Sequence, residues 1–200
     1  MKKKKIIIGI LIILVLVAGV LFIVRYKMNQ GGVPITCESN YAVNENLIAY
    51  RQDDARWEDD NIGNSRFTMG DSGCIITSIA TGISQSKSSL TPGELNALLT
   101  DNNVFDEEGN LQWGMLEQID GFHVKVYSDI TNQNIDDCLE NGRYPIIKVH
   151  RKTLTSYHHY ILIIGTEDGD YVCMDPLEDH LTKLSDYGNK VYAIRCVWYE

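Results

Sequence analysis

The sequence predicts an α+β domain that is built on one antiparallel sheet and preceded by one transmembrane helix. Helical patterns fill the first half of the domain and strand patterns fill the second, an order that is typical of α+β proteins. Near the amino terminus, residues 6–24 form an uninterrupted run of 19 apolar residues and glycines. With 200 residues in all, the chain is long enough for one domain of ordinary size and such an appendage.

A membrane anchor is predicted from the apolar run and its charged flanks. At about 1.5 Å per residue, a helix over residues 6–24 would span about 28 Å, close to the thickness of a bilayer core. Lys2–Lys5 precede the run, and only Arg25 and Lys27 follow it closely. This asymmetry predicts a cytoplasmic basic tail over residues 1–5 and a single-pass protein of the cell membrane with an extracellular domain. A cleaved signal peptide is the alternative, but its apolar region is usually shorter and ends at small residues.

The rest of the chain is strongly acidic. Residues 25–45 lack periodicity and are predicted to form a stalk, which leaves residues 46–200 for the folded domain. The whole chain has a formal charge of −9. Six of its 18 basic residues and none of its 27 acidic residues lie in the first 27 positions, so the remainder carries −15. Such a charge argues against a nucleic-acid binder, which needs a basic surface, and it favours cationic partners.

Three helices are expected in the domain. Residues 74–84 place their isoleucines on one helical stripe. Thr91, Pro92 and Glu94 match a capping box with proline at the first helical position, so a second helix begins there. A third, shorter helix is expected over residues 132–141.

Four strands are predicted in the second half, and two of them form a hairpin. The strands are predicted from apolar or alternating segments at 145–149, 159–165, 170–175 and 190–198. Turn-forming residues at 167–169 join the second strand to the third.

Five cysteines follow the apolar run, at positions 37, 74, 138, 173 and 196. Because the number is odd, at least one thiol is free or pairs with another chain. If Cys74 is the free one, the other four allow three disulfide connectivities. Burial of Cys138, Cys173 and Cys196 as free thiols is an equal or better interpretation.

Cys74 is the candidate nucleophile because it directly precedes an amphipathic helix. The positive end of the helix dipole favours the thiolate, which is the reactive form of cysteine, and free N–H groups there could stabilise an oxyanion. Gly73 leaves room for a substrate backbone, whereas the nearby carboxylate of Asp71 opposes thiolate formation. A cysteine that merely begins a helix is the alternative.

A histidine and an aspartate are placed to support this thiol. His159 opens the most apolar strand, and Asp175 closes the next one, before Pro176. If the two strands form a hairpin, Asp175 comes near residue 160 and so lies beside His159. A thiol nucleophile needs a base, and the base needs a group that orients it. His158 would point away from this pair.

Four motifs in order over residues 48–180 resemble a family of papain-like cysteine peptidases. These are the exported, stand-alone relatives of the bacteriocin-processing peptidases that cleave double-glycine leaders. The first motif is Tyr50–Trp57, which resembles Q-x-D-x-x-W, and the second is Gly73–Ser78, which resembles G-C-x-x-T-S. The third is Leu90–Asn96 together with residues 109–113, and the fourth is His159–Tyr160 together with Asp175–Pro176. Ile75 departs from the small residue that often follows the cysteine in that family, which puts the width of the cleft in doubt.

The resemblance implies a membrane-anchored extracellular cysteine peptidase with a papain-like fold, in which the nucleophile helix packs on the antiparallel sheet. Cys74 would attack a carbonyl, His159 would transfer the proton and Asp175 would fix the histidine tautomer. Gln52 would donate its side-chain amide to the oxyanion, beside the backbone N–H of Cys74. No cofactor is implied, and the histidines and cysteines lack the close spacing of metal ligands.

The expected partners are a peptide or protein substrate, with a cationic one favoured by charge, and the membrane through residues 6–24. Nucleic acid is not expected, and leader processing would require an exporter on a separate chain. Two alternatives stay open: a catalytically silent relative that binds peptides in the same cleft, and a thiol amidase or transferase that acts on cell-wall peptides.

Overall fold

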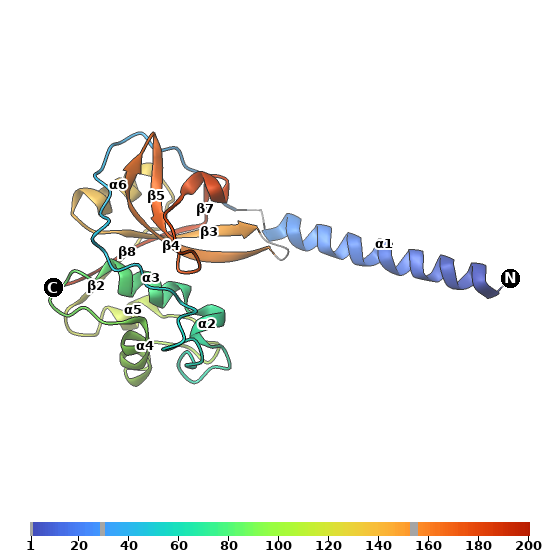
Figure 1. The fold of residues 1–200 in the computed structure, drawn as a ribbon, viewed down its shortest axis with the longest axis horizontal. Coiled ribbons are helices and arrows are strands. Elements are labelled where there is room, and N and C mark those ends of the chain that lie inside the picture. The colour runs from blue at the N-terminus through green and yellow to red at the C-terminus, as the bar shows by residue number, and fades with distance from the viewer. Residues whose placement is uncertain (1, 29–30, 153–155) are drawn as a thin grey trace.

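The computed structural model describes residues 2–28, 31–152 and 156–200, and it confirms the α+β class with an antiparallel sheet (Figure 1). The main sheet has six strands in the order β2-β8-β3-β4-β5-β6, and all neighbours are antiparallel. These strands are β2 (Phe122–Val126), β3 (Pro145–Lys152), β4 (Ser156–Glu167), β5 (Asp170–Met174), β6 (Thr182–Lys183) and β8 (Ala193–Tyr199). A second, two-stranded sheet pairs β1 (Val33–Pro34) with β7 (Lys190–Val191).

Helices cover both sides of the main sheet (Figure 1). One side carries α2 (Met69–Ser72), α3 (Cys74–Gly82), α4 (Pro92–Asp101) and α5 (Trp113–Leu116). The other side carries α6 (Asn132–Glu140) and the short 3-10 helix η1 (Leu184–Tyr187). The three helices predicted from the sequence are α3, α4 and α6.

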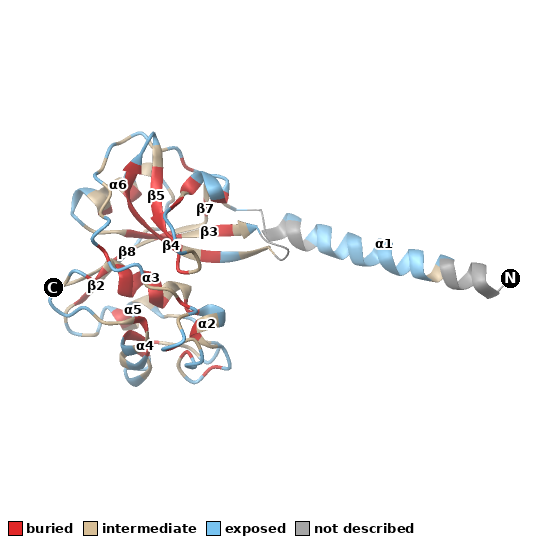
Figure 2. Ribbon diagram, in the orientation of Figure 1, coloured by how far each residue is buried: buried red, intermediate tan, exposed pale blue. Residues whose placement is uncertain are grey.

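The alternation of β4 produces two separate cores. Leu162 and Ile164 pack into the core that contains α3 and α4, whereas Ile161 and Ile163 pack into the core that contains α6 and η1. All four residues are buried, and Figure 2 shows β4 coloured largely as buried. The strand is therefore apolar on both faces, which explains why its sequence reads as a continuous apolar run.

The predicted hairpin of β4 and β5 is present, with a local irregularity. Asp168 and Gly169 have positive φ angles of 52° and 75°, as a tight hairpin turn requires. The register shifts between Ile163 and Gly165, so that Leu162 lies opposite Met174. If this register is continued by one residue, position 175 lies opposite position 161. The sequence predicts position 175 near 160, so the observed pairing differs from the predicted one by one residue.

The transmembrane helix predicted over residues 6–24 is wrong. The helix α1 (Lys2–Met28) extends away from the domain (Figure 1), but among the described residues no helix is both long and apolar enough to cross a membrane. The predicted single-pass localisation in the cell membrane, with an extracellular domain, is wrong for the same reason.

Part of the segment expected to be a stalk packs against the domain. Ile35 is buried in the core beside η1, and β1 is held by its pairing with β7. Further along, Asn44 N–H donates to the Ile164 carbonyl at 3.1 Å, and Thr166 N–H donates to the Tyr41 carbonyl at 3.0 Å. These bonds place the segment beside β4 where its pairing with β3 has ended.

Candidate active site

Cys74 is the first residue of α3, as the sequence predicts. Gly73 separates this helix from the short α2, and a Cβ at Gly73 would collide with the Met69 carbonyl. Glycine is therefore required where the backbone packs this closely against Met69. The Cys74 side chain is partly exposed, while the following turns of α3 are buried in the core.

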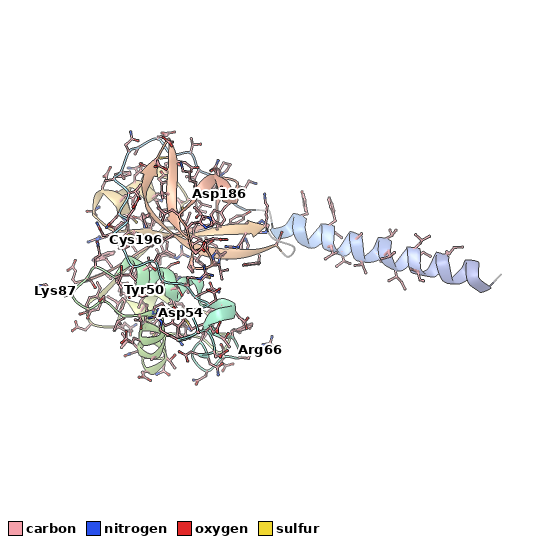
Figure 3. All side chains as sticks on the ribbon, in the orientation of Figure 1. Tyr50, Asp54, Arg66, Lys87, Asp186 and Cys196 are labelled. Carbon is pink, nitrogen blue, oxygen red and sulfur yellow. The ribbon has the colours of Figure 1, made fainter. Side chains whose placement is uncertain are left out.

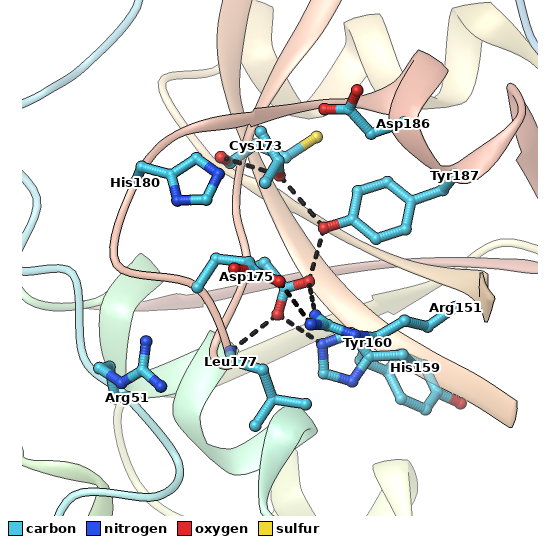
Figure 4. Close-up of polar contacts among 12 residues, drawn as sticks. Arg51, Arg151, His159, Tyr160, Cys173, Asp175, Leu177, His180, Asp186 and Tyr187 are labelled. Carbon is cyan, nitrogen blue, oxygen red and sulfur yellow. Dashed lines mark hydrogen bonds and ion pairs between the residues drawn. The ribbon is translucent and has the colours of Figure 1, made fainter. Parts of the chain in front are cut away.

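His159 and Asp175 come together as predicted. Both are buried, with 1% and 4% of their surfaces exposed, and His159 Nε2 lies 2.6 Å from Asp175 Oδ1 (Figure 4). The register shift between β4 and β5 does not prevent this contact. Position 175 falls opposite 161, which shares a strand face with 159, so the two side chains are diagonal neighbours.

Asp175 is bonded by four donors, and the sequence predicted only His159 among them. Leu177 N–H donates to Oδ1 at 2.8 Å, while Arg151 and the Tyr187 hydroxyl donate to Oδ2 at 2.7 and 2.5 Å (Figure 4). Burial alone would raise the pKa of Asp175, but the bonds and the charge of His159, with the bonds from Tyr187 and Leu177, lower it below its ordinary value. The carboxylate is therefore ionised and fixed from both sides.

Arg151 could have been found from strand alternation. Val149 pairs with His159, so Arg151 lies two residues further along the same face of β3. The predicted strand ended at 149, three residues before β3 ends, and Arg151 fell outside it. Tyr187 lies on η1, a short helix with no periodicity to reveal it, and no sequence signal pointed to it.

The surroundings of His159 favour its charged form. Burial lowers the pKa of His159, but the hydrogen bonds to Asp175 and to the Cys74 thiol, together with their charges, raise it to about 9. The structure thus brings together three of the four predicted site residues. The imidazole lies between the carboxylate and the thiol.

Gln52 is buried near the turn that leads to Cys74. Its Nε2 donates to the Gly70 carbonyl at 2.7 Å, and its backbone N–H donates to the Pro176 carbonyl at 3.0 Å. The side-chain amide carries two N–H donors, so one remains after the bond to Gly70. Trp57 anchors this loop, since it is buried and donates its indole N–H to the Arg51 carbonyl at 2.9 Å.

A cleft of about 300 Å³ opens beside Cys74. Its walls combine aromatic and aliphatic side chains with a few polar ones: Ile62, Phe67, Ser72, Ile75, Glu108, Gly109, Asn110, Leu111, Trp113 and Tyr160. A second cavity, of about 320 Å³, borders Asp175 and is lined by Tyr50, Arg51 and His180 among others, but not by Cys74. The hydrogen bond from Gln52 N–H to the Pro176 carbonyl joins the loop that carries Gln52 to the loop that follows Asp175. Of the two cavities, the first is the one lined by Cys74.

His158 has a different environment from its neighbour. Its side chain is exposed and stacks edge-on against Tyr192, with ring centroids 4.8 Å apart, and it also contacts His150. Burial, Lys148 and His150 lower its pKa. Neither Cys74 nor Asp175 contributes to this shift, which agrees with the expectation that His158 points away.

The sequence matches no protein-family model, and no curated protein matches it. The resemblance to papain-like peptidases therefore remains a prediction from the motifs. Among the described residues, no cluster of three or more histidine, cysteine, aspartate or glutamate side chains could hold a metal ion.

Proposed function

We propose that this chain is a cysteine peptidase that cleaves peptide bonds with a papain-like set of residues. One observation carries the proposal: the buried His159 is bonded to Asp175 on one side and to the Cys74 thiol on the other. A nucleophile, a base and a group that orients the base are the minimum for thiol catalysis. They lie at the start of a helix and beside an open cleft.

The protonation states follow from the contacts. Nε2 faces Asp175, so Nδ1 is the nitrogen that serves the thiol. With a pKa of about 9, His159 is an imidazolium at neutral pH, and its positive charge lies beside the Cys74 sulfur. The start of α3 adds the positive end of a helix dipole.

In the proposed reaction, Cys74 Sγ forms a bond to the substrate carbonyl carbon, and the electron pair of the C=O double bond moves to oxygen. The backbone N–H of Cys74 and the second amide N–H of Gln52 would stabilise this oxyanion. When the pair returns, the C–N bond breaks and His159 gives its proton to the departing amine. A water, deprotonated by His159, then hydrolyses the thioester and releases Cys74.

The walls of the cleft support a peptide substrate. Apolar and aromatic side chains can contact substrate side chains, while Asn110 and Glu108 offer polar partners at the edge. The acidic domain favours substrates with basic residues.

A set of quenched fluorescent peptides of varied sequence, incubated with the full-length chain, tests the proposal. Cys74→Ala and His159→Ala should each abolish hydrolysis, because thiolate formation and proton delivery need the pair. His158→Ala is the matched control and should retain activity, since His158 contacts Tyr192 rather than the site. Hydrolysis that survives in Cys74→Ala would refute the proposal. Peptide binding without hydrolysis would identify a silent relative instead.

A further inference from the structure

Two buried thiols outside the proposed active site lie against each other. Cys196 is on β8, inside the domain (Figure 3), and Cys138 is on α6. They are 2% and 1% exposed, and both are free thiols. Their side chains are in hydrogen-bonding contact.

The strand register independently places them together. Cys196 pairs with Lys125 of β2, so the two side chains lie on the same face of the sheet. Lys125 reaches across that face to Asp137 of α6 at 2.8 Å, and Asp137 precedes Cys138. Tyr127, two residues along from Lys125, contacts the Cys138 sulfur with its hydroxyl at 3.6 Å. The face that carries Cys196 is therefore the face that α6 covers.

The surroundings make the two thiols unequal. The hydrogen bond with Cys196 lowers the pKa of Cys138, and burial raises it. The Tyr127 hydroxyl and the charge of Lys125 lower the pKa of Cys138 further. The same contact with Cys138, with burial, raises the pKa of Cys196. Because the Tyr127 hydroxyl contacts the Cys138 sulfur, Cys138 is the thiol placed to attack and Cys196 is the one placed to resolve.

Cys173 provides the contrast. It is fully buried, burial raises its pKa well above the ordinary value, and carboxylates rather than a thiol surround it. Burial by itself therefore does not create a reactive cysteine in this domain.

We propose that Cys138 and Cys196 are a redox-active dithiol that a hydroperoxide converts to a disulfide. The Cys138 thiolate attacks one oxygen of hydrogen peroxide, the O–O bond breaks, and Cys138 becomes a sulfenic acid with release of hydroxide. The Cys196 sulfur then attacks the Cys138 sulfur, and the S–OH oxygen leaves as water. Overall, two thiols and one hydrogen peroxide give one disulfide and two waters.

The disulfide would tie α6 to β8 on the side of the sheet opposite α3. It would close the chain between positions 138 and 196, a long loop for which cross-linking restricts the unfolded chain strongly. Oxidation should therefore raise Tm by roughly 10 °C. This inference does not depend on the proposed peptidase function, because none of the active-site residues takes part.

Peptide mapping of the full-length chain after hydrogen peroxide treatment tests the proposal. The protein is unfolded, its remaining thiols are alkylated, and it is digested without reduction. We expect a cross-linked pair of peptides containing Cys138 and Cys196, lighter by two hydrogens than the separate thiol peptides and separated by dithiothreitol. Cys173→Ser, the matched control, should retain the cross-link. Cys196→Ser should leave Cys138 as a sulfenic acid that dimedone traps.

Three results would overturn the proposal. Recovery of both cysteines as alkylated thiols, under conditions that oxidise Cys74, would show that the pair is inert. Cys138 found as a sulfinic acid in the wild-type protein would show that Cys196 does not resolve it. A cross-link from either cysteine to Cys37 or Cys173 would show that the pairing is wrong. The wild-type map decides each of these, even if a variant does not fold.

Discussion

Replacing Asp175 by asparagine should lower the pKa of His159 while preserving the orientation of the ring. The asparagine Oδ1 can still accept from His159 Nε2 and from Leu177 N–H, which now lie 2.6 and 2.8 Å from the carboxylate oxygen. The charge is lost. At the second position of the side chain, an amide NH₂ would replace Oδ2, which accepts from Arg151 at 2.7 Å in the wild type. Arg151 and the amide NH₂ are both donors, so this hydrogen bond would be lost.

The size of the effect follows from the removed charge. A charge of opposite sign at hydrogen-bonding distance typically moves a pKa by about 1 to 3, which corresponds to about 1.4–4 kcal/mol. The pKa of His159 is about 9 in the wild type. At pH 7.5 that value gives about 97% imidazolium, and a pKa lower by 2 gives about 24%. Most of the charge that faces Cys74 would be lost.

The assay is an NMR titration of labelled histidine, with the His159 resonance assigned from its absence in His159→Gln. Asp179→Asn is the matched control, because Asp179 is an exposed carboxylate bonded to another histidine, His180, at 3.0 Å. It should lower the pKa of His180 and leave His159 unchanged. The reasoning is refuted if His159 still titrates near 9 in Asp175→Asn, or if both variants shift it equally.

Three further outcomes are expected. The pKa of His159 is raised from 6.5 to about 9, so its contribution to stability is complete below pH 6.5 and is lost by about pH 9. Urea unfolding should show the wild type losing roughly 2–4 kcal/mol more over that range than His159→Gln, and equal losses would contradict it. Gly165→Ala should destabilise the fold by about 3 kcal/mol or more, because φ is +154° and a Cβ would lie 2.6 Å from Val43 Cα. The control Gly142→Ala, at a position with φ +66° and open space, should cost only about 1 kcal/mol. Similar denaturation midpoints for the two variants would contradict this prediction. Gln52→Ala should reduce kcat by about 10² to 10³, the size of one oxyanion donor, and an unchanged kcat would remove Gln52 from the site.

Local patterns in the sequence were sufficient for much of the fold. The capping box at Thr91 and Glu94 forms as predicted, with Glu94 accepting from Thr91 N–H at 2.9 Å. The continuous apolar run of β4 and the turn after it gave the hairpin that brings His159 to Asp175. These features depend on neighbours along the chain, so a single sequence can reveal them.

Features that depend on distant partners were missed. β2 was not predicted, although its sequence alternates, because its five residues are stabilised by pairing with β8 at the end of the chain. The segment at 41–44 has no regular pattern and is held by bonds to β4. The contact of Cys138 with Cys196 likewise arises only once α6 has packed on the sheet.

The donors around Asp175 determine how the proposed site could work in both halves of a reaction. Burial by itself raises the pKa of this carboxyl group, because burial disfavours the charged form. His159 alone could not compensate for burial, since a base must become neutral when it gives up its proton. Arg151 is bound to Asp175 and also to Glu178, so its charge remains in place at that moment, and Tyr187 adds a neutral donor. Asp175 can therefore stay ionised and keep Nε2–H directed toward itself, and the same nitrogen of His159 faces Cys74 whether the ring is charged or neutral.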